Sequence, residues 1–185
     1  MGQHDSSEGA FSPLSDCETL CPVCPSGSLR DGKTFEIQLQ NLPKVCIVTF
    51  SEVKYDVVEC VESIDAIGGS CEQAVDITLC EGTPSEQTIS CCLTLDYLQL
   101  RGELELLFNI AGQCDTDCLI EPKEVNFHAV AAVPVDELCY YCAGTRPSIE
   151  NGELCDLFSV VIDSVSETGL VTYTVQFLDC PPPKQ

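Results

Sequence analysis

Cysteine constrains this chain more than any other residue type, because 15 of its 185 residues are cysteines. That share, about 8%, is near the level at which a disulfide scaffold is the default interpretation. Disulfides persist only in oxidising compartments, so the cysteine content favours a location outside the cytosol. The number is also odd, so complete oxidation leaves at least one cysteine either free or paired with another chain.

The spacing of eight cysteines beyond residue 40 favours disulfides over a metal centre. Metal ligands come grouped, whereas these cysteines are scattered through predicted strands and turns, as crosslinks between neighbouring strands are. We expect at least three disulfides, with other cysteines serving as small buried apolar residues. The scattered positions are Cys46, Cys60, Cys71, Cys80, Cys91, Cys92, Cys155 and Cys180.

Cys91 and Cys92 are adjacent within a predicted strand and therefore point to opposite faces of the sheet. They reach in two directions. One is expected to form a bond within the domain, while the other faces solvent or another chain.

The hydrophobic pattern predicts β-strands throughout the main part of the chain. Residues 34–40 and 171–177 alternate apolar and polar side chains, which is the signature of a half-buried strand. β-branched and aromatic residues in these segments suit a pleated surface. Further strands are predicted at 45–50, 53–60, 74–80, 88–98, 103–110, 125–133 and 158–162.

Glycine and proline pairs predict the turns between these strands. The predicted turns are Gly68-Gly69, Glu81-Gly82-Thr83-Pro84, Arg101-Gly102, Glu121-Pro122, Asn151-Gly152 and Thr168-Gly169. The one helix candidate is the segment from Pro134 to Tyr141. Eight or nine short strands without helices between them predict an all-β fold, an antiparallel β-sandwich of jelly-roll-like type.

Composition divides the chain into three predicted regions. Residues 1–32 are rich in Ser, Gly, Asp, Glu and Pro without a hydrophobic period, so we expect a flexible, cysteine-bearing arm. Residues 33–180 form the sandwich domain, and the proline-rich residues 181–185 form a stub that cannot continue a sheet. A mobile arm with three thiols, Cys17, Cys21 and Cys24, is well placed to reach a neighbouring subunit, although it can equally fold back on its own domain.

Two C-x2-C pairs keep a metal-binding interpretation open. Cys21 with Cys24, and Cys139 with Cys142, offer the four thiolates of a structural zinc site, although a long stretch of sequence separates the two pairs. The alternative hypothesis is therefore a cysteine-rich zinc or iron module. Under the disulfide interpretation no cofactor is expected.

The charge limits the partners. Thirty carboxylates against eight basic side chains give a net charge of −22, which repels nucleic acid and anionic membranes. Such a surface is expected to attract Ca²⁺ only as a diffuse counterion. No apolar run is long enough for a membrane span. The first nine residues lack a basic start and an apolar core, so no secretory signal is recognisable.

The sequence does not predict an enzyme. It contains two histidines: His4 lies in the predicted arm, and His128 lies in a predicted strand with no nucleophile motif around it. Nucleotide-binding glycine patterns and calcium loops are also absent from the sequence.

The order of features resembles the bacterial endospore appendage subunits, small jelly-roll proteins with a cysteine-bearing N-terminal connector and no signal peptide. The resemblance implies that residues 1–32 are the connector and that Cys17, Cys21 and Cys24 crosslink it to other subunits. It also implies acceptor cysteines in the domain, for which we take Cys180 and either Cys91 or Cys92.

Together these observations predict a structural subunit without catalytic activity. It would assemble with copies of itself into a disulfide-crosslinked fibre, extracellular or on a spore surface. A rival hypothesis is an acidic β-sandwich of adhesion or capsid-like type, in which every disulfide is internal.

Overall fold

The computed structural model describes residues 17, 19–44, 46–59, 64–115, 121, 123–149 and 154–184, with the backbone alone at 52–59. Seven strands and one 3₁₀ turn, η1, make up its regular structure. They are β1 (Lys33–Gln38), β2 (Ile47–Glu59), β3 (Ile64–Leu79), β4 (Gln87–Asp115), β5 (Lys123–Cys142), η1 (Cys155–Leu157), β6 (Phe158–Val165) and β7 (Leu170–Phe177).

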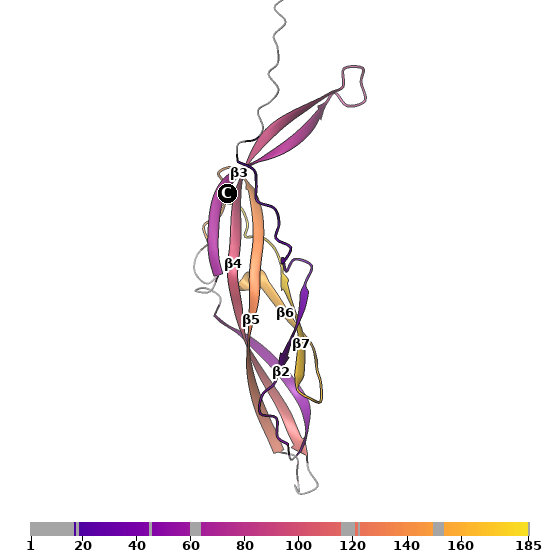
Figure 1. Cartoon of the computed structure of the whole chain (residues 1–185), viewed down its shortest axis with the longest axis vertical. Helices are drawn as coiled ribbons and strands as arrows, with labels where there is room; N and C mark the ends of the chain where they lie inside the picture. The colour runs from indigo at the N-terminus through magenta and orange to yellow at the C-terminus, as the bar shows by residue number, and fades with distance from the viewer. Residues whose placement is uncertain are drawn as a thin grey trace, which may run out of the picture.

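The strands form two antiparallel sheets that pack against each other, which confirms the predicted all-β sandwich (Figure 1). The smaller sheet has the order β1-β7-β6. In the larger sheet, β4 pairs with β5 along one edge. Its other edge pairs with β3 over the first half and with β2 over the second half.

The core lies between the two sheets. Phe108 of β4 is fully buried, and its ring centroid lies 4.7 Å from that of Tyr173 in β7. Alternate residues of β4 and β7 point inward, as the period of two requires. The members of the core cluster from these strands are Leu98, Leu100, Leu104, Leu106, Phe108 and Ile110 of β4 with Val171, Tyr173, Val175 and Phe177 of β7.

Two predicted turns are wrong, because both fall inside long strands. Arg101-Gly102 lies within the 29 residues of β4, so the strands predicted at 88–98 and 103–110 are one strand. Gly68-Gly69 lies within β3. A Cβ atom at Gly69 would come within 2.5 Å of the Tyr97 ring, and one at Gly68 would collide with the Arg146 guanidinium. Glycine is used here for close approach of side chains, not for a turn.

The predicted helix at Pro134–Tyr141 is also wrong, because the segment continues β5. Val133, Val135, Glu137, Cys139 and Tyr141 are buried at alternate positions, as in a strand, and Leu138 is buried as well. Among the described strands, β5 pairs with β4 alone. It is an edge strand of this sheet, and a proline such as Pro134 is tolerated at an edge.

The described part of the predicted arm packs against the domain. Leu29 is fully buried in the core. Glu137 of β5, also fully buried, accepts hydrogen bonds from the Leu29 backbone N–H and, at 2.7 Å, from the Ser28 hydroxyl. Arg30 lies 3.8 Å from the same carboxylate and stacks over the Phe177 ring. A buried carboxylate must be satisfied in this way, so Glu137 fixes residues 28–30 in place.

The described residues of the proline-rich C-terminus also lie along the domain. The Tyr141 hydroxyl donates to the Pro181 carbonyl at 3.0 Å, and the Lys184 N–H donates to the Thr145 carbonyl at 2.8 Å.

Candidate functional site

The most distinctive feature of the molecule is a two-stranded hairpin that projects from the sandwich (Figure 1). β3 and β4 pair in register from Leu79 opposite Gln87 to Ile64 opposite Gly102, but β5 pairs with β4 only from Leu95 onward. Residues 73–79 and 87–93 therefore form a ribbon of two strands, closed by the turn at 80–86. We call this segment the β3–β4 ribbon.

One face of the ribbon is apolar and the other is polar. Directly paired residues of antiparallel strands share a face, so the alternation places six apolar side chains on one side. They are Val75, Ile77, Leu79, Ile89, Cys91 and Leu93, and Gln73 and Gln87 share the face at the two ends of the ribbon. Ile77, Leu79, Ile89 and Leu93 have exposed fractions between 42% and 49%. The opposite face carries Asp76, which accepts a hydrogen bond from Ser90.

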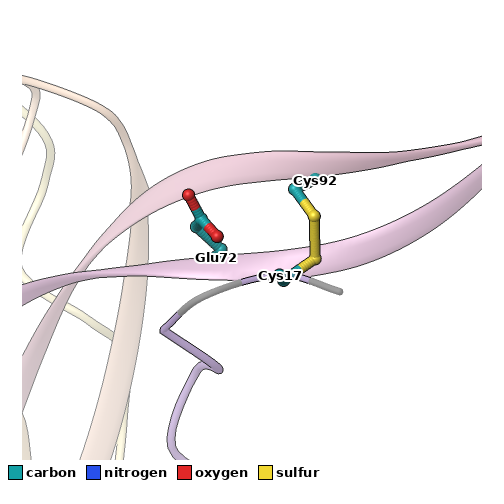
Figure 2. A group of neighbouring side chains, drawn as sticks. All are labelled: Cys17, Glu72 and Cys92. Carbon is teal, nitrogen blue, oxygen red and sulfur yellow. A yellow bond between two sulfur atoms is a disulfide. The ribbon is translucent and has the colours of Figure 1, made fainter. Parts of the chain in front are cut away.

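Disulfides attach the N-terminal segment to the base of the ribbon. Cys17 bonds to Cys92 of β4, and Cys21 bonds to Cys71 of β3. Between them, Leu20 forms a parallel bridge with Glu72: the Cys21 N–H donates to the Glu72 carbonyl at 3.2 Å, and the Glu72 N–H donates to the Thr19 carbonyl at 2.6 Å. Figure 2 shows the Cys17–Cys92 bond beside Glu72. These two disulfides thus attach the N-terminal segment at the point where the ribbon projects from the sandwich.

These bonds change the assignment of the crosslinking cysteines. Of the six positions expected to pair between chains, Cys17, Cys21, Cys92 and Cys180 are bonded within this chain, the last to Cys139. Cys24 and Cys91 are free. The described disulfides also include Cys46–Cys114, and Cys155 is disulfide-bonded as well. Cys60 and Cys118 lie outside the described residues.

Two free cysteines lie on the ribbon itself. Cys80 is exposed in the turn at its tip, with a φ of 55°, and its carbonyl accepts hydrogen bonds from the Thr83 N–H and hydroxyl. Cys91 is half-buried in the centre of the apolar face. The ribbon therefore presents one thiol at its tip and one on its apolar face.

The other two free cysteines, Cys24 and Cys142, are exposed near Tyr140. Cys142 follows Tyr140 by two positions and shares its face of β5. The Tyr140 hydroxyl donates to the Pro22 carbonyl. Desolvation raises the pKa of Tyr140, and the charge of the nearby Cys24 thiolate raises it further. Two thiols thus flank this tyrosine.

The four-thiolate zinc site of the alternative hypothesis has only two thiols in this structure. Cys21 and Cys139 are consumed by disulfides, whereas Cys24 and Cys142 remain free. A second group, Cys17, Glu72 and Cys92, has its possible ligand atoms within 4.8 Å of one another. Its two sulfurs are bonded to each other, so they offer no thiolate, the form that binds a metal (Figure 2).

Elsewhere the surface offers shallow pockets. One of about 430 Å³ is lined by Asp96, Gly144, Arg146 and Lys184, among others. A hydrogen bond from Ser70 and one from the Gly144 N–H lower the pKa of Asp96. The ring of His128 hydrogen-bonds to the Asn109 amide at 2.6 Å on an exposed strand face. The absence of catalytic activity remains a prediction, and His4 lies outside the described residues.

Sequence reasoning missed Cys80 and Cys142 as free thiols. The alternation of Val75-Asp76-Ile77-Thr78-Leu79 and the Glu81–Pro84 turn were signals for an amphipathic hairpin. The sequence contains no corresponding signal that β5 ends before the hairpin does, so that residues 87–94 of β4 have no partner strand from β5.

Within the part of the chain that the structure describes, no helix is long and apolar enough to cross a membrane. The several disulfides fit an extracellular or secreted protein. Comparison with protein-family models, with curated proteins and with solved structures finds no match.

Proposed function

We propose that this chain is a structural subunit that assembles with copies of itself into a disulfide-crosslinked extracellular fibre or surface layer. The observation that carries the proposal is the set of free cysteines at the surface: Cys24, Cys80, Cys91 and Cys142 remain unpaired in a chain whose other described cysteines are all oxidised. In an oxidising compartment an accessible thiol exchanges with a small-molecule disulfide, and a second thiol then displaces the small molecule from the mixed disulfide. A second subunit supplies that second thiol.

The position of these thiols suits contacts between chains. Cys80 lies at the far end of the projecting ribbon, away from the sandwich core (Figure 1). A thiol at the tip of a protrusion reaches a neighbouring molecule more easily than another cysteine of its own domain. In this proposal the ribbon contacts the neighbouring subunit, which is the role that the sequence predicted for the N-terminal arm.

The described arm cysteines have a different role in this proposal. Cys17 and Cys21 hold the base of the ribbon, so they stabilise the element that presents Cys80 and Cys91. Cys24 is the arm cysteine that stays available for pairing between chains.

Electrostatics favours covalent assembly. Subunits that each carry a net charge of −22 repel one another, and salt weakens but does not abolish this repulsion at contact. A disulfide holds two such subunits together whatever the ionic strength. Counterions such as Ca²⁺ would reduce the repulsion without a dedicated site.

The proposal is tested with a variant that carries serine at Cys24, Cys80, Cys91 and Cys142. Oxidised wild-type protein should form polymers that sediment, are visible by negative-stain electron microscopy and dissolve with reductant. The fourfold variant should stay monomeric with the circular dichroism spectrum of the wild type. Identical polymers from both proteins would remove these four cysteines from the assembly. A wild type that stays monomeric after oxidation would favour the acidic β-sandwich with internal disulfides.

The spore-surface location rests on the resemblance of the layout to spore appendage subunits. It is tested by immunogold labelling of spores and vegetative cells of the source organism. Labelled fibres or surface layers on spores would support it. Labelling confined to vegetative cells would replace it with another extracellular structure.

A further inference from the structure

The apolar face and the open edge of the β3–β4 ribbon together point to a specific partner. We infer that the open edge of β4 at residues 88–94 pairs antiparallel with the same segment of a second copy, and that the contact is locked by a Cys91–Cys91 disulfide. This inference rests on the proposed function and names the surface through which two subunits meet.

The β4 edge of the ribbon has no partner strand among the described residues. β5 stops at Cys142, opposite Leu95, so no strand within the described residues pairs with the β4 edge from Gln87 to Thr94. Backbone N–H and C=O groups along such an edge are a template for strand addition. The edge is long enough for a seven-residue pairing.

The ribbon carries little charge compared with the rest of this acidic chain. Among residues 73–79 and 87–93 the single charged side chain is Asp76, which points to the polar face. A chain of net charge −22 would be expected to recruit a basic partner wherever its surface is acidic. The apolar face of the ribbon has no carboxylate with which a basic partner could form an ion pair. A second acidic copy can approach this face without direct charge repulsion.

One register of pairing between the two β4 edges fits the alternation of side chains. Pairing centred on Cys91 sets Cys91 opposite Cys91 of the second copy and Ile89 opposite Leu93. It uses residues 88–94, nearly the whole unpaired edge. It also keeps every apolar side chain on the same face of the resulting four-stranded sheet, because a one-residue slip would turn the two apolar faces to opposite sides. A two-fold contact of this kind is self-complementary by construction.

This register also brings the two Cys91 residues to a distance that a disulfide can span. Directly opposite residues of antiparallel strands have Cα atoms about 4.5–5.5 Å apart, within the range that a disulfide spans. Each Cys91 thiol gives up one proton and one electron. A small-molecule disulfide accepts both electrons and both protons and leaves as two thiols. A two-fold contact closes on itself, so Cys80, Cys24 and Cys142 remain for links to further subunits.

The test uses full-length protein with serine at Cys24, Cys80 and Cys142, so that Cys91 is the one described free cysteine. Oxidised glutathione should convert it to a dimer of twice the 20.0 kDa chain mass on non-reducing gels, with a Cys91–Cys91 peptide by mass spectrometry. Ile89→Glu, which places two carboxylates on the apolar face near the two-fold axis, should abolish most of the dimer. Thr78→Glu, on the polar face of the same ribbon, should leave it intact.

Three outcomes would overturn the inference. Wild-type polymer without a Cys91–Cys91 peptide would reject this contact while leaving the proposed function standing. A dimer equally abundant in Ile89→Glu would indicate random collision of thiols. Absence of any interchain disulfide in the wild type would reject the proposed function as well.

Hydrogen exchange identifies the occupant of the edge. In Cys91→Ser protein, the test concerns those amides of residues 88–94 that point away from β3. Their protection should rise with protein concentration, because a second copy supplies the strand. Protection that does not depend on concentration would mean that a segment of the same chain covers the edge. No protection at any concentration would mean that purified subunits do not pair there, and either result would overturn the inference.

Discussion

Cys91 and Cys92 are neighbours in β4 with opposite roles: Cys92 is bonded to Cys17, whereas Cys91 is free on the apolar face of the ribbon. Their opposite orientation follows from the alternation of side chains along a strand. One of the pair bonds within the chain, as expected, but its partner Cys17 belongs to the N-terminal segment and not to the sandwich domain. The same alternation separates the polar from the apolar face of the ribbon.

Removing the Cys17–Cys92 bond should destabilise the chain. The bond joins residues 75 apart in sequence, and a crosslink over a loop of that length restricts the unfolded state. We expect Cys17→Ser/Cys92→Ser to lower the free energy of unfolding by about 2–4 kcal/mol, as measured by urea denaturation. Cys91→Ser, one position away, should change it by no more than about 0.5 kcal/mol. Equal effects of the two variants would contradict this division of roles.

The buried Glu137 carboxylate should contribute strongly to stability. Glu137→Gln keeps the size of the side chain but removes the charge that Ser28, Leu29 and Arg30 share. Hydrogen bonds to a charged group contribute about 1.5–3 kcal/mol, so we expect a loss of that order in chemical denaturation. Glu124→Gln, at an exposed position of the same strand, is the matched control and should be neutral. A neutral Glu137→Gln would show that the carboxylate is not needed to hold residues 28–30.

Gly69 should not tolerate a side chain. A Cβ atom there would lie within 2.5 Å of the Tyr97 ring on the paired strand, so Gly69→Ala must displace the ring. We expect a loss of about 1–3 kcal/mol in thermal or chemical unfolding, as for other overpacked sites. Gly27, with nothing within 4 Å of its Cβ position, is the control. Combining Gly69→Ala with Tyr97→Ala should recover part of the loss. A Gly69→Ala variant as stable as Gly27→Ala would contradict the close contact.

Asp96 should add an acid-sensitive component to stability. Its pKa in the folded chain lies below the ordinary value of 3.8, because the Ser70 hydroxyl and the Gly144 N–H donate to the carboxylate. The ionised side chain therefore stabilises the fold above about pH 4, and this contribution is lost as the pH falls through the lowered folded-state pKa. The urea midpoint of the wild type should fall more steeply between pH 5 and pH 3 than that of Asp96→Asn. Parallel curves would show that Asp96 contributes nothing.

The sequence predicted the strands well where one face alone is buried. The alternation at 171–177 and 34–40 gave β7 and β1 nearly to the residue. It failed where tertiary contacts override a local signal. Gly68-Gly69 is a turn signal by composition, but here Tyr97 and Arg146 occupy the space that side chains would fill. The segment from Pro134 to Tyr141 was the helix candidate, yet Glu137 within it is a buried strand residue whose carboxylate is satisfied by the N-terminal segment.

The cysteine pairs were beyond sequence reasoning for a different reason. Which cysteines meet depends on sheet register and on the path of residues 17–32, and neither is encoded in spacing. Cys21 and Cys24 look like one motif, but Cys21 bonds to Cys71 whereas Cys24 is free near Tyr140. Register likewise decides that Cys139 bonds to Cys180 and that Cys142 stays free.

A gel assay on native material tests whether disulfides join separate chains. Native material is treated with an alkylating agent to block free thiols, then run on denaturing gels with and without reductant. Covalent assembly predicts a ladder or well-retained material without reductant, which collapses to a single band near 20.0 kDa with reductant. A single band of that mass in both lanes would contradict covalent assembly.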